Sequence, residues 1–404
     1  MSVVASRRPT LIAAVGFALG GIGFALGNLL LARFLPGSEY GAVALFLAFI
    51  QIGITLGPLG MSTAVNRHQL QATPAILKRV CATCSVAAFA LGAVSYFAYH
   101  FHPLLVLTLV LAAFAAGLNR VGSAFFQSHQ RLALSLLLML APNWVILCSV
   151  PVALLHQSAI PVALVISCGY FVMVVLGWRR ALCGAGRSHQ LSEVTASVLG
   201  REGFSLIGFQ LAVMLMLQLE RLLIPHVLSM VDLAKYAAVS AVAGAPFRVL
   251  QLGVGYSLLP RLRACDTRER AQRLVRSESG AILLLAILAG AGVLLLTHWI
   301  MAIFVSDRYT FSYQLLSAIV VLGFAAVWST FATVIVSACG TTRQLFLLNL
   351  SSWSALAATL ILASLVGSLG LTALVCSIAA GWTLSALGAT ALATSVLKNR
   401  YKAK

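Results

Sequence analysis

Long apolar segments recur along almost the whole chain, and no stretch of domain size separates them. They run from about residue 11 to residue 397. A helix needs roughly 20 mostly apolar residues to cross the hydrocarbon core of a bilayer. In lipid, only helices and closed barrels satisfy all of their backbone hydrogen bonds. The pattern predicts an all-α polytopic membrane protein with about twelve transmembrane helices.

The expected spans are joined by short loops and use up the 404 residues. The third and fourth spans are separated by only two residues, Phe101 and His102. In order, we expect them at 11–33, 40–65, 80–100, 103–119, 132–155, 159–178, 203–225, 235–258, 279–303, 312–337, 345–366 and 370–397.

Charged residues make up only 9% of the chain, against about 25% in a typical soluble domain. The formal net charge of +18 would suggest a nucleic-acid partner in a soluble protein. Here the basic residues lie in short loops between apolar segments, which is the pattern that orients a membrane protein. We therefore expect contacts with membrane lipids and no nucleic-acid binding.

The basic residues sort to one side of the membrane along the whole chain. With the N-terminus in the cytoplasm, 22 of the 27 lysines and arginines fall on the inner side. The five that do not are Arg33, Arg221, Lys235, Arg248 and Arg308. An error in the number of helices would assign the basic residues that follow it to the opposite side of the membrane. The sequence thus predicts an even number of helices with both termini in the cytoplasm.

The inner loop 179–202 divides the expected spans six and six. We expect an N-terminal six-helix lobe at 1–178, an inter-lobe loop at 179–202 and a C-terminal six-helix lobe at 203–404. Since six is even, both lobes enter from the same side, and any repeat is parallel. Similar short segments lie at the ends of the first and seventh spans, Ala32-Arg33-Phe34-Leu35 and Glu220-Arg221-Leu222-Leu223.

Glycines and prolines inside the spans indicate close packing and bends. The first span carries four glycines, which let helix backbones approach closely in lipid: Gly16, Gly20, Gly23 and Gly27. Prolines remove a backbone hydrogen bond and bend helices, and four fall within expected spans: Pro58, Pro142, Pro151 and Pro246. The single CxxC pair, Cys81 and Cys84, lacks the second pair or histidines of a metal site, so we expect no metal and no cofactor.

Ionisable residues inside spans are costly, so they are functional candidates. Arg248 lies near the middle of the eighth span and shares a face with Gln251. On the seventh span Gln210, Gln218 and Arg221 share a face, and Glu220 adjoins Arg221. A structural alternative is that Arg221 reaches the outer interface while Glu220 pairs with another helix. The candidate cavity residues are Arg248, Arg221, Glu220, Gln218, Gln210, Gln251, Asn28 and Arg33.

Apart from Glu220, no acidic residue lies deep in an expected span. Exporters of cationic drugs usually need carboxylates at that depth, whereas arginine binds phosphate in a bidentate manner. A mildly cationic cavity therefore favours an anionic headgroup such as a pyrophosphate. The expected loops hold no Walker sequence, HExxH or paired carboxylates, and none is large enough for a catalytic domain. We do not expect an enzyme.

Four short segments form a recognisable set: Gly27 to Leu35, Glu39-Tyr40-Gly41, Glu220-Arg221 and Leu259-Pro260-Arg261-Leu262. Together they resemble bacterial polysaccharide flippases of the multidrug/oligosaccharidyl-lipid/polysaccharide exporter (MOP) superfamily. The resemblance implies two six-helix lobes in a MATE-like, V-shaped arrangement in the bacterial inner membrane. It also implies flipping of an undecaprenyl-pyrophosphate-linked oligosaccharide for surface polysaccharide synthesis, with polysaccharide polymerase or assembly proteins as partners.

Two alternatives remain open from the sequence. The first is a multidrug or metabolite exporter on the same fold, for which the few membrane carboxylates are the discriminating feature. The second is a membrane polysaccharide polymerase or ligase, which would need a large periplasmic loop that the expected topology does not offer.

Overall fold

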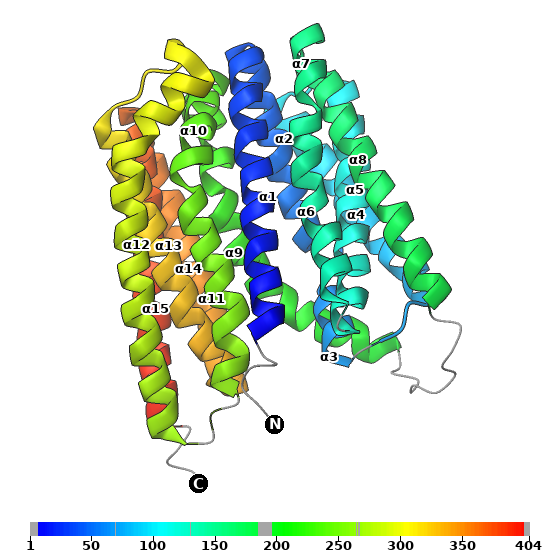
Figure 1. Ribbon diagram of the computed structural model, residues 1–404, viewed down its shortest axis with the longest axis vertical. Coiled ribbons are helices and arrows are strands. Elements are labelled where there is room, and N and C mark those ends of the chain that lie inside the picture. The colour runs from blue at the N-terminus through cyan, green and yellow to red at the C-terminus, as the bar shows by residue number, and fades with distance from the viewer. Residues whose placement is uncertain are drawn as a thin grey trace. The chain divides into compact units, whose positions relative to one another are not determined.

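The computed structural model describes residues 7–68, 70–129, 131–184, 196–263, 265 and 267–399, and these residues form helices and short connections without a β-strand (Figure 1). Their backbone contacts define two compact units, Met1–His226 and Val227–Lys404. The first holds α1 (Arg7–Phe34), α2 (Gly37–Leu56), α3 (Met61–His68), α4 (Pro74–Tyr99), α5 (Pro103–Ser128), α6 (Leu132–Cys148), α7 (Val150–His156), α8 (Ala159–Gly184) and nearly all of α9 (Ala196–Val227). The second holds α10 (Met230–Ala243), α11 (Ala245–Arg263), α12 (Arg268–Val305), η3 (Ser306–Arg308), α13 (Tyr313–Cys339), α14 (Thr342–Val366), η4 (Gly367–Leu369) and α15 (Leu371–Asn399).

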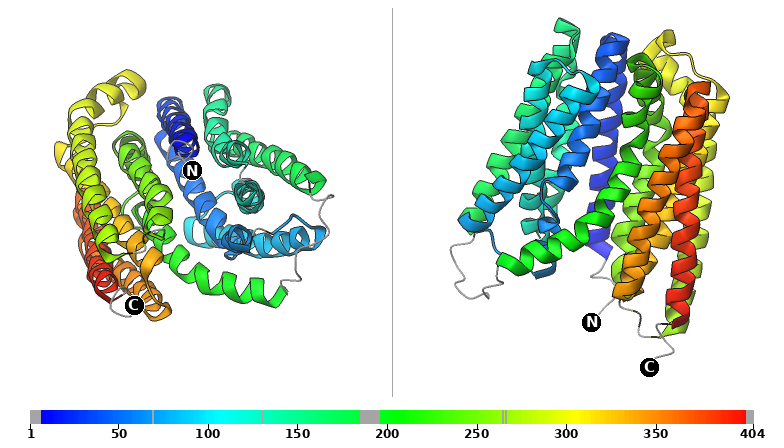
Figure 2. Two further views of the ribbon diagram at one scale, coloured as in Figure 1. Left: turned by 60° about the horizontal axis from the view of Figure 1, so that its bottom comes forward. Right: turned by 180° about the vertical axis from the view of Figure 1, so that it is seen from behind.

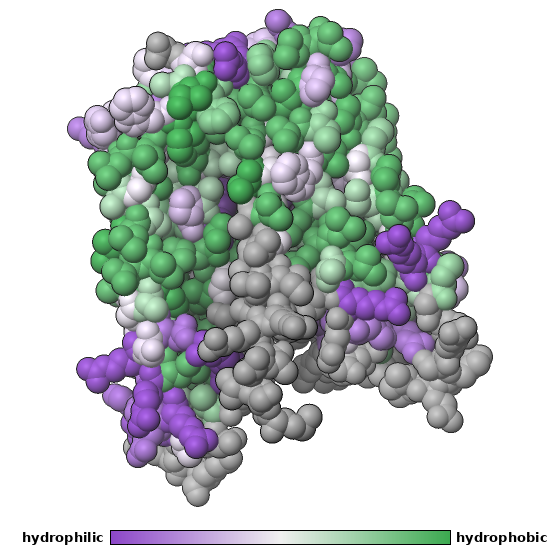
Figure 3. All heavy atoms as spheres, viewed as in Figure 1, coloured by the Kyte–Doolittle hydropathy of each residue, from purple (hydrophilic) through white to green (hydrophobic). Residues whose placement is uncertain are grey.

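Each of the twelve expected spans coincides with a helix or with a pair of broken helices. Within the described residues, nine helices are long and apolar enough to cross a membrane, and the bent pair α10–α11 raises this to ten. The remaining two expected spans correspond to α1 and α9, each of which includes residues whose side chains are not described. On the face seen in Figure 3, hydrophobic side chains cover the middle of the helices and hydrophilic ones gather near their ends. The chain is a multi-pass membrane protein.

Three of the four span prolines lie at helix breaks, as their chemistry predicts. The second span stops at Leu56 and restarts as α3 after Gly57-Pro58-Leu59-Gly60. The eighth span bends by 57° between α10 and α11, next to Pro246. Pro151 lies in the first turn of α7, directly after α6 ends. Pro142 is accommodated inside α6.

Two expected boundaries were wrong, because helices continue beyond their apolar stretches. The fourth span was expected to end at 119, but α5 runs to Ser128, so Arg120 lies inside a helix rather than in a loop. The expected inner loop 259–278 is largely helical as well. There α11 extends to Arg263, and α12 has 38 residues, about 57 Å of helix, of which a bilayer core covers roughly 30 Å. The basic first turns of α12 form this extension.

In the first unit, α5 is the central helix and packs against α2, α3, α4, α6 and α8. Its continuation beyond Arg120 is held by tertiary contacts. Phe125 meets the ring of Trp178 edge-on at 5.4 Å, and the Trp178 indole N–H donates to the Leu118 carbonyl at 3.0 Å. The glycines of α1 lie against α6, in line with the expected close packing. A Cβ at Gly27 would come within 2.9 Å of the backbone nitrogen of Leu147.

In the second unit, α13 takes the corresponding central position and packs against α10, α11, α12, α14 and α15. Figure 2 shows α14 and α15 running side by side. They approach closely at Gly381, where an added Cβ would meet the buried Thr359 hydroxyl. Gly323 of α13 likewise accepts the Phe247 ring of α11 against its backbone.

The two units share a packing pattern that fits the expected repeat. The fourth span of each half, α5 or α13, packs most extensively on the sixth, α8 or α15. The second span of each half is broken next to a proline, Pro58 or Pro246. By backbone contacts, α9 belongs to the first unit, so the boundary between the compact units falls at 226/227 rather than within 179–202. The lobe boundaries of 178 and 203 remain a prediction about the repeat.

Candidate functional site

A polar pocket of about 290 Å³ lies in the first unit, beside the break between α2 and α3. Four helices of this unit contribute to its wall. The lining residues are Ile54, Thr55, Ser62, Thr63, Arg120, Gln210, Val213, Met214 and Leu217. Among these described residues, none is acidic. The pocket therefore joins one guanidinium and several hydroxyl and amide groups to an apolar wall from α9.

The break between α2 and α3 brings hydroxyl side chains to the pocket. Pro58 cannot donate a backbone hydrogen bond, and Leu59 and Gly60 adopt positive φ angles of 45° and 76°. The helix is interrupted there, and a tight turn provides backbone hydrogen bonds. The Met61 amide donates to the Pro58 carbonyl at 2.9 Å. Broken helices of this kind commonly line substrate sites in membrane transporters.

Gln210 is the predicted site residue that the structure places in this pocket. Its amide nitrogen donates to the Thr63 hydroxyl at 3.2 Å, which ties α9 to α3. The side chain keeps its carbonyl oxygen as a further acceptor. Gln210 thus has a defined structural contact, and its role in binding stays a prediction.

Arg120 lines the same pocket, although the expected spans leave this position in an inner loop. It lies eight residues before the end of α5 and is exposed. One guanidinium nitrogen donates to the Met139 sulfur at 3.5 Å, which is a weak acceptor. A guanidinium held this loosely can turn toward an anionic ligand. One sequence signal could have revealed this position. Val121 and Phe125 are apolar and four residues apart, which indicates that the helix continues beyond Arg120.

Gln218, Glu220 and Arg221 lie further along α9, and all three are buried, at 6%, 4% and 3% exposed. An Arg221 side chain that reached the outer interface would be exposed, whereas the structure buries it. The Gln218 carbonyl oxygen has no hydrogen-bond partner among the described residues. This buried acceptor is available to a ligand or a water molecule.

Asn28 and Arg33 of α1 lie away from the lining of this pocket. The Asn28 amide nitrogen donates to the Phe24 carbonyl at 2.8 Å, and the Tyr40 hydroxyl donates to the Asn28 carbonyl oxygen at 3.4 Å. These contacts make Asn28 a connection between α1 and α2. Arg33 is exposed, with its guanidinium carbon 5.8 Å from the centre of the Phe34 ring.

Arg248 and Gln251 lie in α11 of the second unit, both half-buried and three residues apart on one face. The expectation that they share a surface is met by the helix geometry. Their assignment to a cavity is not tested by the contacts within that unit, and it stays a prediction.

Comparisons with known proteins define the family and the fold. The family described as "Polysaccharide biosynthesis protein" matches residues 30–314. A search of curated proteins found no significant match. The lipid II flippase MurJ, in an inward closed conformation, is 13% identical with a TM-score of 0.69, over 94% of this chain and 86% of MurJ.

Multidrug resistance MATE transporters of the MOP superfamily are similar as well. The inward-facing form is 13% identical with a TM-score of 0.67, over 96% of this chain and 99% of the transporter. The outward-facing form is 14% identical with a TM-score of 0.63, over 98% and 96%. These likenesses show the fold, and the family match confirms the resemblance seen in the short motifs. The chain therefore belongs to the polysaccharide biosynthesis protein family and has the fold of the MOP superfamily.

Proposed function

We propose that this protein is a flippase that moves an undecaprenyl-pyrophosphate-linked oligosaccharide from the cytoplasmic to the periplasmic leaflet of a bacterial inner membrane. Membership of a polysaccharide biosynthesis family on a transporter fold supports the transport of a glycan intermediate. Both termini are then cytoplasmic, as the distribution of basic residues favours. Polysaccharide polymerase or assembly proteins are the expected partners.

The pocket at the break between α2 and α3 is the observation that carries the proposal. It presents Arg120 together with Ser62, Thr63 and Gln210, and its described lining has no carboxylate. Guanidinium and hydroxyl groups are suited to phosphate oxygens, because they donate several hydrogen bonds to one anion. The exposed apolar sides of the surrounding helices are suited to a lipid tail that stays in the bilayer.

Deletion of the gene tests the function. A flippase of this kind leaves the polysaccharide repeat unit on its lipid carrier in the inner leaflet, and surface polymer disappears. Normal surface polymer after deletion, in a strain without a second transporter of the family, contradicts the proposal. Altered drug susceptibility without a trapped lipid-linked intermediate would favour the exporter alternative, for which the MATE likeness provides the specific observation.

Arg120 variants test the pocket within that assay. Arg120→Ala should lower the rate at which surface polymer appears by about 10- to 100-fold, since hydrogen bonds to charged groups contribute about 1.5–3 kcal/mol. Arg120→Lys should retain part of the activity, because it keeps the charge and loses the forked geometry. Arg180→Ala is the matched control, as Arg180 is exposed near the end of α8. Equal rates for Arg120→Ala and the control would remove this pocket from the transport path.

A further inference from the structure

A second pocket, of about 440 Å³, lies in the second unit where α12 ends and the chain turns through η3 toward α13. Its size falls in the range of about 300–1,000 Å³ that is usual for small-molecule sites. The lining residues are His298, Trp299, Met301, Ala302, Ser306, Tyr309, Thr310 and Phe311. The described lining contains no lysine, arginine, aspartate or glutamate. The first pocket, by contrast, contains an arginine.

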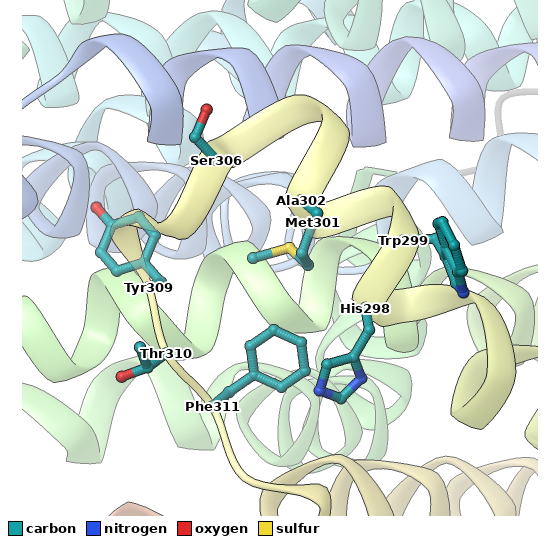
Figure 4. A pocket seen from close by; sticks show the side chains of 8 residues that line it. All are labelled: His298, Trp299, Met301, Ala302, Ser306, Tyr309, Thr310 and Phe311. Carbon is teal, nitrogen blue, oxygen red and sulfur yellow. The ribbon is translucent and has the colours of Figure 1, made fainter.

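Aromatic rings form much of this second pocket. His298 stacks on Tyr313 with ring centroids 4.5 Å apart and lies 4.5 Å from the Phe311 ring. Figure 4 shows Tyr309 and His298 on opposite sides of Phe311 and Met301, so that two polar groups flank an apolar floor. Met301 is 3% exposed and fixes that floor. These two ring contacts restrict the orientation of the His298 imidazole.

Two buried polar atoms of this pocket have no hydrogen-bond partner among the described residues. They are the Tyr309 hydroxyl and the His298 Nδ1. Tyr309 as a whole is only 9% exposed. An unpartnered buried polar group costs about 1–3 kcal/mol, so such groups usually meet a ligand or water. Burial raises the pKa of Tyr309, although the adjacent Arg308 acts in the opposite direction, and the hydroxyl therefore remains a donor at neutral pH.

We propose that this pocket binds a sugar ring of a glycan, with Tyr309 and His298 hydrogen-bonding to its hydroxyl groups. A sugar ring has apolar C–H faces for the aromatic floor, and hydroxyl groups that both donate and accept. Because the described lining has no lysine or arginine, it suits such a ligand better than it suits a phosphate. Naming the ligand as part of a glycan rests on the proposed function. With the termini in the cytoplasm, the pocket faces the periplasm, where a flipped oligosaccharide arrives.

Binding of simple glycosides to the full-length protein tests the proposal. The protein is held in nanodiscs, because the headgroup of a maltoside detergent would compete. Methyl glycosides of glucose, galactose and N-acetylglucosamine are the probes, and saturation-transfer NMR measures their binding. Glycerol and inorganic phosphate are run in parallel, to separate a sugar from a lipid glycerol or a free anion. A glycoside signal that exceeds both supports the sugar assignment, and an equal or stronger signal from glycerol or phosphate overturns it.

Tyr309→Phe and Tyr313→Phe form a matched pair. Both keep the ring, but the first removes a buried hydroxyl and the second removes the hydroxyl of a side chain that is 64% exposed. Tyr309→Phe should weaken glycoside binding by about 3- to 10-fold, whereas Tyr313→Phe should leave it unchanged. Equal binding by both variants and the natural protein overturns the proposal.

The melting temperature provides a second readout that does not depend on the ligand. Removal of an unpartnered buried hydroxyl should leave the apo protein as stable as before or slightly more stable. A clear loss of stability in Tyr309→Phe would mean that the hydroxyl has a structural partner, and it would also overturn the proposal. The flippase function is judged separately by the deletion strain. Normal surface polymer there, combined with intact glycoside binding, refutes the transport proposal and leaves the sugar-binding pocket standing.

Discussion

At the scale of single residues, Asn28 illustrates how a buried amide stabilises a membrane protein. It is 1% exposed, and its amide lies between the Phe24 carbonyl and the Tyr40 hydroxyl. Asn28→Leu keeps the size of the side chain and leaves those groups without this partner. We expect it to reduce the free energy of unfolding by about 1–2 kcal/mol while transport per folded molecule is retained. Thermal unfolding in nanodiscs measures the first effect.

The Tyr40→Phe background provides the control for this prediction. If Asn28 and Tyr40 interact as the structure places them, the two substitutions together should cost less than the sum of their separate effects. Simple additivity would contradict the contact. A loss of transport without a loss of stability would instead support the prediction that Asn28 contacts the substrate.

The raised pKa of Tyr309 predicts how sugar binding depends on pH. The ordinary tyrosine pKa is about 10, and burial moves that of Tyr309 upward, so the neutral phenol persists throughout the range below pH 10. Donation by the hydroxyl should therefore be the same at pH 8 and pH 9. Glycoside titrations at these two values should give equal dissociation constants. A weakening between them would contradict the raised pKa.

The residues of the candidate site were predicted from sequence only in part. Gln210 was identified because polar side chains are rare in apolar segments, and that logic needs no tertiary information. Arg120 was missed because the apolar run of α5 ends near Leu118, and the helix continues only through contacts such as that of Phe125 with Trp178. Tyr309 and His298 were missed for a related reason. Their proximity depends on the turn after α12, which no periodic pattern encodes.

At the scale of helices, hydropathy and proline positions predicted most of the elements. The breaks beside Pro58 and Pro246 follow from the missing backbone donor. The extension of α12 to Arg268 was not predicted, because its first turns are basic and the sequence signal of a span is apolar. The Thr267 hydroxyl accepts from the Arg270 amide and caps this extension. This extension of α12 also forms an ion pair with α11, in which a guanidinium nitrogen of Arg261 lies 2.5 Å from a carboxylate oxygen of Glu278.

The approach of α14 and α15 gives a prediction at this scale. A Cβ at Gly381 would overlap the Thr359 hydroxyl, and that hydroxyl already donates to the Ala355 carbonyl at 2.6 Å. Gly381→Ala should separate the helices and lower stability by about 1–3 kcal/mol, as overpacking usually does. Gly292→Ala in α12 is the matched control, because a Cβ there meets nothing within 4 Å. Thermal unfolding of the two variants should differ clearly, and equal melting temperatures would contradict the close approach.

At the scale of the whole molecule, the orientation of the chain determines on which side of the membrane each segment lies. Basic residues gather at the helix ends that the sequence assigns to the cytoplasm, including the exposed Arg270, Arg273 and Arg276 of α12. Lysines and arginines are retained on the cytoplasmic side during insertion, and this bias sets the topology. Cys265 should therefore face the cytoplasm, while Ser38, at the start of α2, should face the periplasm.

Thiol labelling of spheroplasts measures both positions. In a cysteine-free variant, Cys265 is restored alone or Ser38→Cys is introduced alone, and a membrane-impermeant maleimide is added. Ser38→Cys should react in intact spheroplasts, whereas Cys265 should react only after the membrane is permeabilised. The reverse pattern would place the α12 pocket on the cytoplasmic side and refute its role in receiving a flipped sugar. Labelling of both in intact spheroplasts would contradict an odd number of crossings between residues 38 and 265, on which the even total and the cytoplasmic termini depend.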